Sequence, residues 1–166
     1  MKFKLKPIHA DAIPIALEKA ERYRLLNEPA QAESICLDIL AVDAFHQEAL
    51  VTLLLAITDQ FGDGVGARRA KEIVPRLEKE YDREYYAGII CERQAHAEVR
   101  GSKHGSSYSG YELLLEAMKH YESAEQSRPA NNDDSILRWN TCARYLAQHS
   151  NLQPRPAEMH QEILGE

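Results

Sequence analysis

Apolar residues recur at steps of three and four along most of this chain, which is the spacing of one face of an α-helix. The first such run covers residues 13–26 and the second covers residues 30–40. An Asn-Glu-Pro break at residues 27–29 separates them, so we expect two antiparallel helices that pack side by side. The apolar faces consist of Ile13, Leu17, Ala20 and Leu25 in the first run, and of Ala32, Ile35, Cys36 and Ile39 in the second.

The same spacing predicts five further helices, over residues 46–60, 67–81, 83–99, 111–127 and 133–148. Pro75 lies inside the 67–81 run. Because proline has no amide hydrogen and clashes with the carbonyl four residues earlier, that of Lys71, we expect the helix to kink or divide there. The glycine-rich residues 61–66 predict a turn, and the glycine- and serine-rich residues 101–110 predict a flexible loop.

The two ends of the chain give weaker signals. Residues 1–10 alternate apolar and basic side chains with no second strand to pair with, so we expect residues 1–12 to form an extended arm that lies on the first helix. Asp11 is the predicted N-cap of that helix, and Pro14 is compatible with its first turn. The tail, residues 149–166, contains two prolines and then a short helical pattern over residues 157–164.

The stretch from residue 117 to residue 145 is the most regular part of the sequence. Ala117, Tyr121 and Ala124 share one helix face, and Pro129 ends that helix. The Asn/Asp cluster at residues 132–134 can then cap the next helix by accepting hydrogen bonds from its first amides. This stretch resembles the second helix of a tetratricopeptide repeat followed by the first helix of the next repeat.

The resemblance extends over residues 13–148. The small residues that open the second helices are Ala32, Ala70 and Ala117, at intervals of 38 and 47 residues, whereas a tetratricopeptide unit has about 34. The turn at 61–66 and the loop at 101–110 hold most of the additional residues. The resemblance implies an all-α, right-handed superhelical stack of antiparallel hairpins with about seven helices. Its pairs cover residues 13–40, 46–81 and 83–127, and a capping helix covers residues 133–148.

In such a stack the first helix of each pair lines the concave surface. Carried over to this chain, the inner positions are Glu18, Glu21, Thr52, Leu55, Arg93, His96, Arg138, Asn140, Thr141 and Arg144. The resemblance therefore implies a partner-binding set of Arg93, His96, Arg138, Asn140 and Arg144, since Asn and Arg side chains hold a peptide carboxylate in clamp-type members of the family. The alternative is that Arg138 and Arg144 pair with Asp133, Asp134 or Glu92 within the protein.

Composition narrows the range of functions. The 20 basic and 26 acidic residues give a net charge of −6, which disfavours general nucleic-acid binding because that depends on a positive surface. No run approaches the roughly 20 apolar residues of a membrane span. The three cysteines are scattered and no secretion signal is visible, so we expect reduced thiols in a cytoplasmic protein with no membrane partner.

Catalytic and cofactor motifs are weak. The glycines of residues 62–66 lack the strand and the Lys-Ser/Thr of a phosphate-binding loop. The pairs Glu92/His96 and Glu116/His120 have metal-ligand spacing, but no further ligands accompany either pair, so we expect solvated helix pairs. Cys91, Cys142 and the serines of residues 102–109 lack any nucleophile motif. We therefore expect no enzyme activity, no cofactor and no resident metal.

The sequence thus predicts a non-catalytic scaffold that binds a partner peptide or protein in a concave helical groove. A second copy of the chain is an alternative occupant, which would make the protein a structural homo-oligomer. Docking of residues 157–164 in the groove would make it self-capped. A small metal-dependent helical-bundle enzyme that uses Glu92, His96 and His120 is the remaining alternative.

Overall fold

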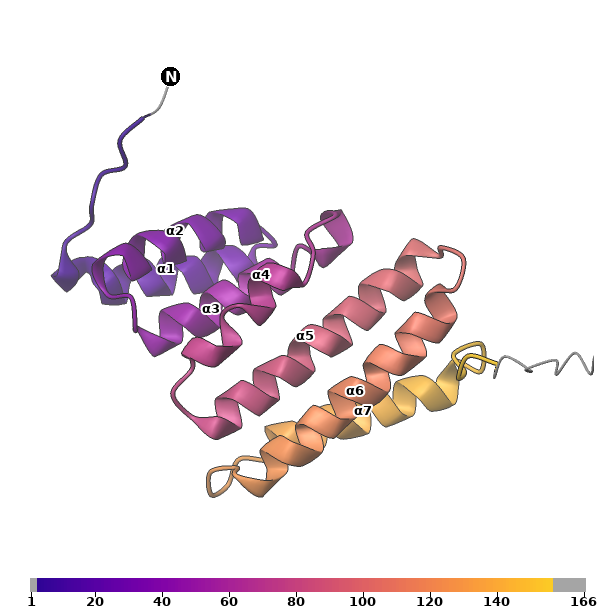
Figure 1. The fold of residues 1–166 in the computed structure, drawn as a ribbon. Coiled ribbons are helices and arrows are strands. Elements are labelled where there is room, and N and C mark those ends of the chain that lie inside the picture. The colour runs from indigo at the N-terminus through magenta and orange to yellow at the C-terminus, as the bar shows by residue number, and fades with distance from the viewer. Residues whose placement is uncertain (1–2, 157–166) are drawn as a thin grey trace, which may run out of the picture.

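The computed structural model describes residues 3–156, and all of the regular secondary structure in that range is helical (Figure 1). The described residues contain seven α-helices, three short 3-10 turns and no strand, so the predicted all-α class is confirmed. The helices are α1 (Ile13–Leu25), α2 (Pro29–Val42), α3 (Gln47–Thr58), α4 (Arg68–Lys71), α5 (Glu80–Gly101), α6 (Ser106–Gln126) and α7 (Asp134–Gln148).

The first three helices pack as consecutive neighbours, α1 on α2 and α2 on α3. Ala20 on α1 and Ala32 on α2 are fully buried in their shared core, together with Cys36 and Leu54. Both alanines belong to the apolar faces that the sequence predicts, and small side chains at these positions allow the helix axes to approach closely. Full burial of an aliphatic side chain such as Leu54 stabilises the fold by about 1.5–3 kcal/mol.

The predicted helix over residues 67–81 is wrong in extent. Helix α4 ends at Lys71, and a 3-10 turn over Val74–Arg76 follows it. Pro75 lies in that turn, and Leu77 has extended backbone angles. The predicted division at Pro75 is therefore confirmed, since proline cannot donate the hydrogen bond that would continue the α-helix. Although it is short, α4 is held to α2 by an ion pair between Arg69 and Glu33.

Helices α5 and α6 form a long antiparallel hairpin, and both begin earlier than the sequence predicts. Residues 106–110, which we expected to be part of a flexible loop, are the first turn of α6. Gly110, one of the glycines that predicted a loop, lies at a close contact between the two helices, where a Cβ atom would be 2.6 Å from a methyl carbon of Val99 on α5. The glycine thus serves close helix packing. The chain reverses at Ser102 and Gly105, which both have positive φ angles.

The helix face that the sequence predicts for α6 is buried as expected, since Ala117, Tyr121 and Ala124 are each at most 1% exposed. The ring of Tyr121 lies against Gly88 of α5, where a Cβ atom would be only 2.5 Å from Tyr121 Cε1. Helix α7 then packs on α6. Asp133 occupies the N-cap position of α7 without a side-chain cap hydrogen bond. Within the predicted Asn/Asp cluster, the side-chain oxygen of Asn132 accepts a hydrogen bond from the Asp134 amide at 2.9 Å.

Two predictions for the N-terminal end are wrong. The arm extends away from the helices (Figure 1), and the side chains of Phe3 and Leu5 are more than four-fifths exposed. Only Ile8 packs against the α1–α2 core. Asp11 does not cap α1, because it lies in a preceding 3-10 turn and Ala12 occupies the N-cap position. The short helical pattern predicted over residues 157–164 lies outside the described residues.

Across residues 3–156, none of the helices has both the length and the apolar character needed to cross a membrane.

Candidate functional site

A cleft of about 360 Å³ opens where the C-terminal ends of α1 and α3 face the second half of α5. These are the first helices of the three pairs that the sequence predicts. The cleft is lined by Arg24, Leu25 and Asn27 from the end of α1, by Thr58 and Asp59 from the end of α3, and by Arg93, His96 and Arg100 from α5.

One carboxylate fixes two of the arginines in this cleft. The Nε–H of Arg24 donates to Asp59 Oδ2 at 2.8 Å, and Nη1 of Arg93 pairs with the other oxygen, Oδ1. Arg93 also donates to the Thr58 hydroxyl at 2.8 Å. Because these contacts occupy only part of each guanidinium, both arginines keep donors for a further anion in a fixed orientation.

The cleft is positive on a chain that is negative as a whole. Three arginines, Arg24, Arg93 and Arg100, line it together with a single carboxylate, that of Asp59, which leaves an excess of two positive charges. Arg100 is exposed and forms no ion pair with any residue in the described range. Leu25 is 88% exposed at the rim. The cleft therefore offers charge-assisted donors next to an apolar contact.

A buried polar network lies next to the cleft and joins α5, α6 and α7. Glu92 is 3% exposed. Its carboxylate accepts a hydrogen bond of 2.5 Å from the Tyr121 hydroxyl and one of 3.3 Å from Arg138. Burial raises the pKa of Glu92, but the neighbouring His96, the hydrogen bond from Tyr121 and the charge of Arg138 outweigh it, so the net pKa is lowered. Glu92 therefore stays ionised and neutralises Arg138 inside the bundle.

His96 connects this network to the cleft. Its Nε2 lies 3.8 Å from the Glu92 carboxylate, and its ring packs edge-on against Tyr145 of α7 with centroids 4.5 Å apart. Tyr145 in turn stacks on His149. These contacts hold α7 against the half of α5 that lines the cleft.

The structure separates the five residues that the sequence predicts as a partner-binding set. Arg93 and His96 line the cleft. Arg138 pairs with Glu92, as the alternative interpretation predicted. Asn140 is half-buried on α7, and Arg144 is exposed there with no ion pair to any described residue.

The remaining inner positions do not form a single surface. Thr52 is buried, and it lines a second cleft with Glu21, whereas Glu18 is exposed on α1. Leu55 is partly buried. It packs against the hydrophobic core that contains Leu54 and also against the core between α5, α6 and α7.

The ligand set Glu92, His96 and His120 is not assembled. His120 Nδ1 lies 2.8 Å from Glu84, whereas Glu92 binds Tyr121 and Arg138. The described residues contain one group with metal-ligand spacing, Cys91, Glu116 and His120. The three cysteines are free, and burial raises the pKa of Cys36 and Cys142 to about 12 and that of Cys91 to about 11. Their thiols are therefore protonated and poorly nucleophilic at neutral pH.

Sequence reasoning missed Arg24, Asp59 and Arg100. A signal existed for Arg100, because it follows Arg93 by seven residues and so lies on the same helix face. No signal existed for Arg24 and Asp59, which are 35 residues apart and meet only through packing of α1 against α3.

No protein-family model matches the sequence, and no curated protein or solved structure is significantly similar to the chain.

Proposed function

We propose that this protein is a non-catalytic interaction module that binds an acidic segment of a partner protein in the cleft between α1, α3 and α5. Its helices would form a right-handed stack of antiparallel pairs similar to tetratricopeptide repeats. The observation that carries the proposal is the convergence of Arg24, Arg93 and Arg100 on one cleft of a chain with net charge −6.

The charge distribution favours a carboxylate-bearing ligand. Asp59 orients Arg24 and Arg93 before a ligand arrives, so little side-chain entropy is lost on binding. Arg100 has no intramolecular partner among residues 3–156, and a ligand carboxylate would supply one. An apolar side chain next to that carboxylate would cover the exposed Leu25. We therefore expect the ligand to be a short acidic segment that also carries a large aliphatic residue.

The test uses two matched pools of short peptides, one with fixed Asp and Glu positions and one with Asn and Gln at the same positions. Binding is measured by fluorescence anisotropy at low and high salt. We expect binding of the acidic pool only, and weaker binding at high salt because exposed charges are screened. Arg100→Glu should reduce affinity at least tenfold, since a hydrogen bond to a charged group contributes about 1.5–3 kcal/mol.

Arg144→Glu is the matched control, because Arg144 is also an exposed arginine but lies outside the cleft on α7. Its affinity should stay within twofold of wild type. If Arg144→Glu abolishes binding and Arg100→Glu does not, the binding surface is on α7 and the proposal is wrong. If neither pool binds and light scattering shows a concentration-dependent dimer, the occupant is a second copy of the chain.

A further inference from the structure

A separate cavity of about 210 Å³ lies where α4 and the following 3-10 turn meet α5 and α6. Three side chains with metal-binding atoms line it: Cys91 from α5, and Glu116 and His120 from α6. Lys71 at the end of α4 also lines it. None of these residues belongs to the arginine-lined cleft.

The fold brings the three ligand atoms together from two helices. Glu116 and His120 are four residues apart and therefore share one face of α6. Cys91 is buried on the opposing face of α5. One ligand atom from each residue lies within 4.8 Å of the other two.

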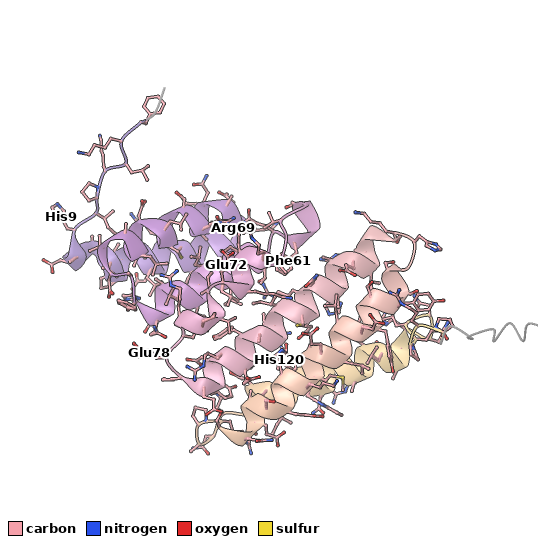
Figure 2. The ribbon with its side chains drawn as sticks, in the orientation of Figure 1. His9, Phe61, Arg69, Glu72, Glu78 and His120 are labelled. Atoms are coloured by element: carbon pink, nitrogen blue, oxygen red, sulfur yellow. The ribbon has the colours of Figure 1, made fainter. Side chains whose placement is uncertain are left out.

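A fourth side chain orients the histidine. His120 Nδ1 lies 2.8 Å from a carboxylate oxygen of Glu84 on α5 (Figure 2 labels His120). With Nδ1 engaged in this way, Nε2 is the nitrogen that remains available to a cation. A histidine that ligates a metal commonly donates its other N–H to a carboxylate, which fixes the tautomer and makes the ligand more basic.

We propose that Cys91, Glu116 and His120 bind a zinc ion, with Glu84 positioning His120 and the fourth coordination position open to the cavity. Sulfur, imidazole and carboxylate ligands together suit Zn²⁺, and three protein ligands with an open position are a known zinc arrangement. A tetrahedral ion requires ligand atoms about 3.3–3.6 Å apart, given zinc–ligand distances of about 2.0–2.3 Å. Since the ligand atoms already lie within 4.8 Å of one another, their separations need to shorten by at most about 1.5 Å, and the exposed Glu116 is free to adjust.

The charges in the cavity are consistent with a bound cation. Coordination would replace the proton of the Cys91 thiol, which passes to solvent, and zinc would then neutralise the thiolate and the Glu116 carboxylate. Among the residues that line this cavity, Lys71 carries a positive charge that would repel a bound cation. Its side chain is exposed enough to turn toward solvent. The Lys71→Met variant should therefore bind zinc at least as tightly as wild type.

The test is a titration of untagged, chelator-treated protein with Co²⁺ as a spectroscopic probe, followed by displacement with Zn²⁺. We expect one equivalent of Co²⁺ with a thiolate charge-transfer band and the visible bands of a tetrahedral ion. Cys91→Ser should abolish the charge-transfer band, and Glu116→Gln or His120→Gln should weaken affinity at least tenfold. Glu84→Gln should weaken it about 10–100-fold, as removal of such an orienting partner usually does.

Cys142→Ser and His104→Gln are the controls, because Cys142 is a second buried thiol of the same core and His104 is an exposed histidine. Both should keep the wild-type affinity and spectrum. Circular dichroism shows whether each variant is folded; Glu116 is exposed and His120 half-buried, so their variants remain informative even if Cys91→Ser unfolds. The proposal would be overturned if the protein did not bind stoichiometric Co²⁺, or if Glu116→Gln and His120→Gln left Co²⁺ binding unchanged.

Discussion

The buried hydrogen bond between Tyr121 and Glu92 gives the sharpest prediction about stability. Tyr121→Phe removes one oxygen atom and leaves the ring on Gly88 in place, so it creates almost no cavity. It deprives the buried Glu92 carboxylate of its 2.5 Å hydrogen bond, while Arg138 stays as the remaining partner at 3.3 Å.

The expected cost follows from the charge on the acceptor. Hydrogen bonds to ionised groups contribute about 1.5–3 kcal/mol, so we expect Tyr121→Phe to lower the free energy of unfolding by about 2 kcal/mol. For a domain of this size, each kcal/mol corresponds to about 2–4 °C in Tm, which gives a decrease of about 4–8 °C. With a urea m-value near 2 kcal/mol/M, the midpoint should fall by about 1 M.

Urea unfolding at pH 7, followed by far-UV circular dichroism, measures this cost. Tyr111→Phe is the control, since Tyr111 packs on the same core and its hydroxyl has no side-chain partner among the described residues. We expect its free energy of unfolding to match that of wild type within about 0.5 kcal/mol. A Tyr121→Phe midpoint as close to wild type as that of the control would refute the assignment of Tyr121 as a stabilising partner of Glu92.

The same variant has a defined pH dependence. The pKa of Glu92 is lowered from its ordinary value of 4.5 in the folded protein. The stability that this ionised carboxylate contributes is therefore complete above pH 4.5 and is lost as pH falls through the lower, folded pKa. Because the hydrogen bond between Tyr121 and a protonated Glu92 joins two neutral groups, the difference between wild type and Tyr121→Phe should shrink at acid pH. A difference that stays constant with pH would contradict this.

Two further predictions concern packing. Gly110→Ala should cost about 1–3 kcal/mol in urea unfolding, because the new methyl group would lie 2.6 Å from Val99 Cγ2. Adding Val99→Ala removes that atom and should recover part of the loss; a double variant that is no better than the sum of the single variants would contradict the proposed clash. Leu54→Ala, in a fully buried position, should cost about 2–5 kcal/mol. The exposed Leu137→Ala should change stability by less than about 0.5 kcal/mol, and similar values for the two leucines would show that the α1–α3 core is wrongly described.

The sequence predicts the helical class and most helix positions well. The apolar faces of the first two helices are buried as expected at Ile13, Leu17, Ala32 and Ile39, but Leu25, predicted for the same face as Leu17, is 88% exposed. The division at Pro75 was also readable, because the missing amide hydrogen is a property of that residue alone. The start of α6 was not predicted, since serines and glycines are typical of loops, and the close packing of Gly110 on Val99 of α5 is visible only in the structure.

The candidate sites were only partly readable. Arg93 and His96 were predicted to line a groove, and both line the arginine-lined cleft. Arg138 was placed in the same set, yet it faces Glu92, because the packing of α7 turns it toward the interior of the α5–α7 bundle. The pair Glu116 and His120 was visible from its spacing, but Cys91 and Glu84 join it only through the antiparallel register of α5 and α6.

The sequence by itself determined most of the residues that face inward on each helix, because a period of 3.6 residues repeats within a single segment and needs no knowledge of its neighbours. Only the tertiary structure decided which of those faces meet. The angle and register at which two helices pack depend on side chains far apart in the chain, and these set the pairing of Arg24 with Asp59, of Glu92 with Tyr121, and of Cys91 with His120.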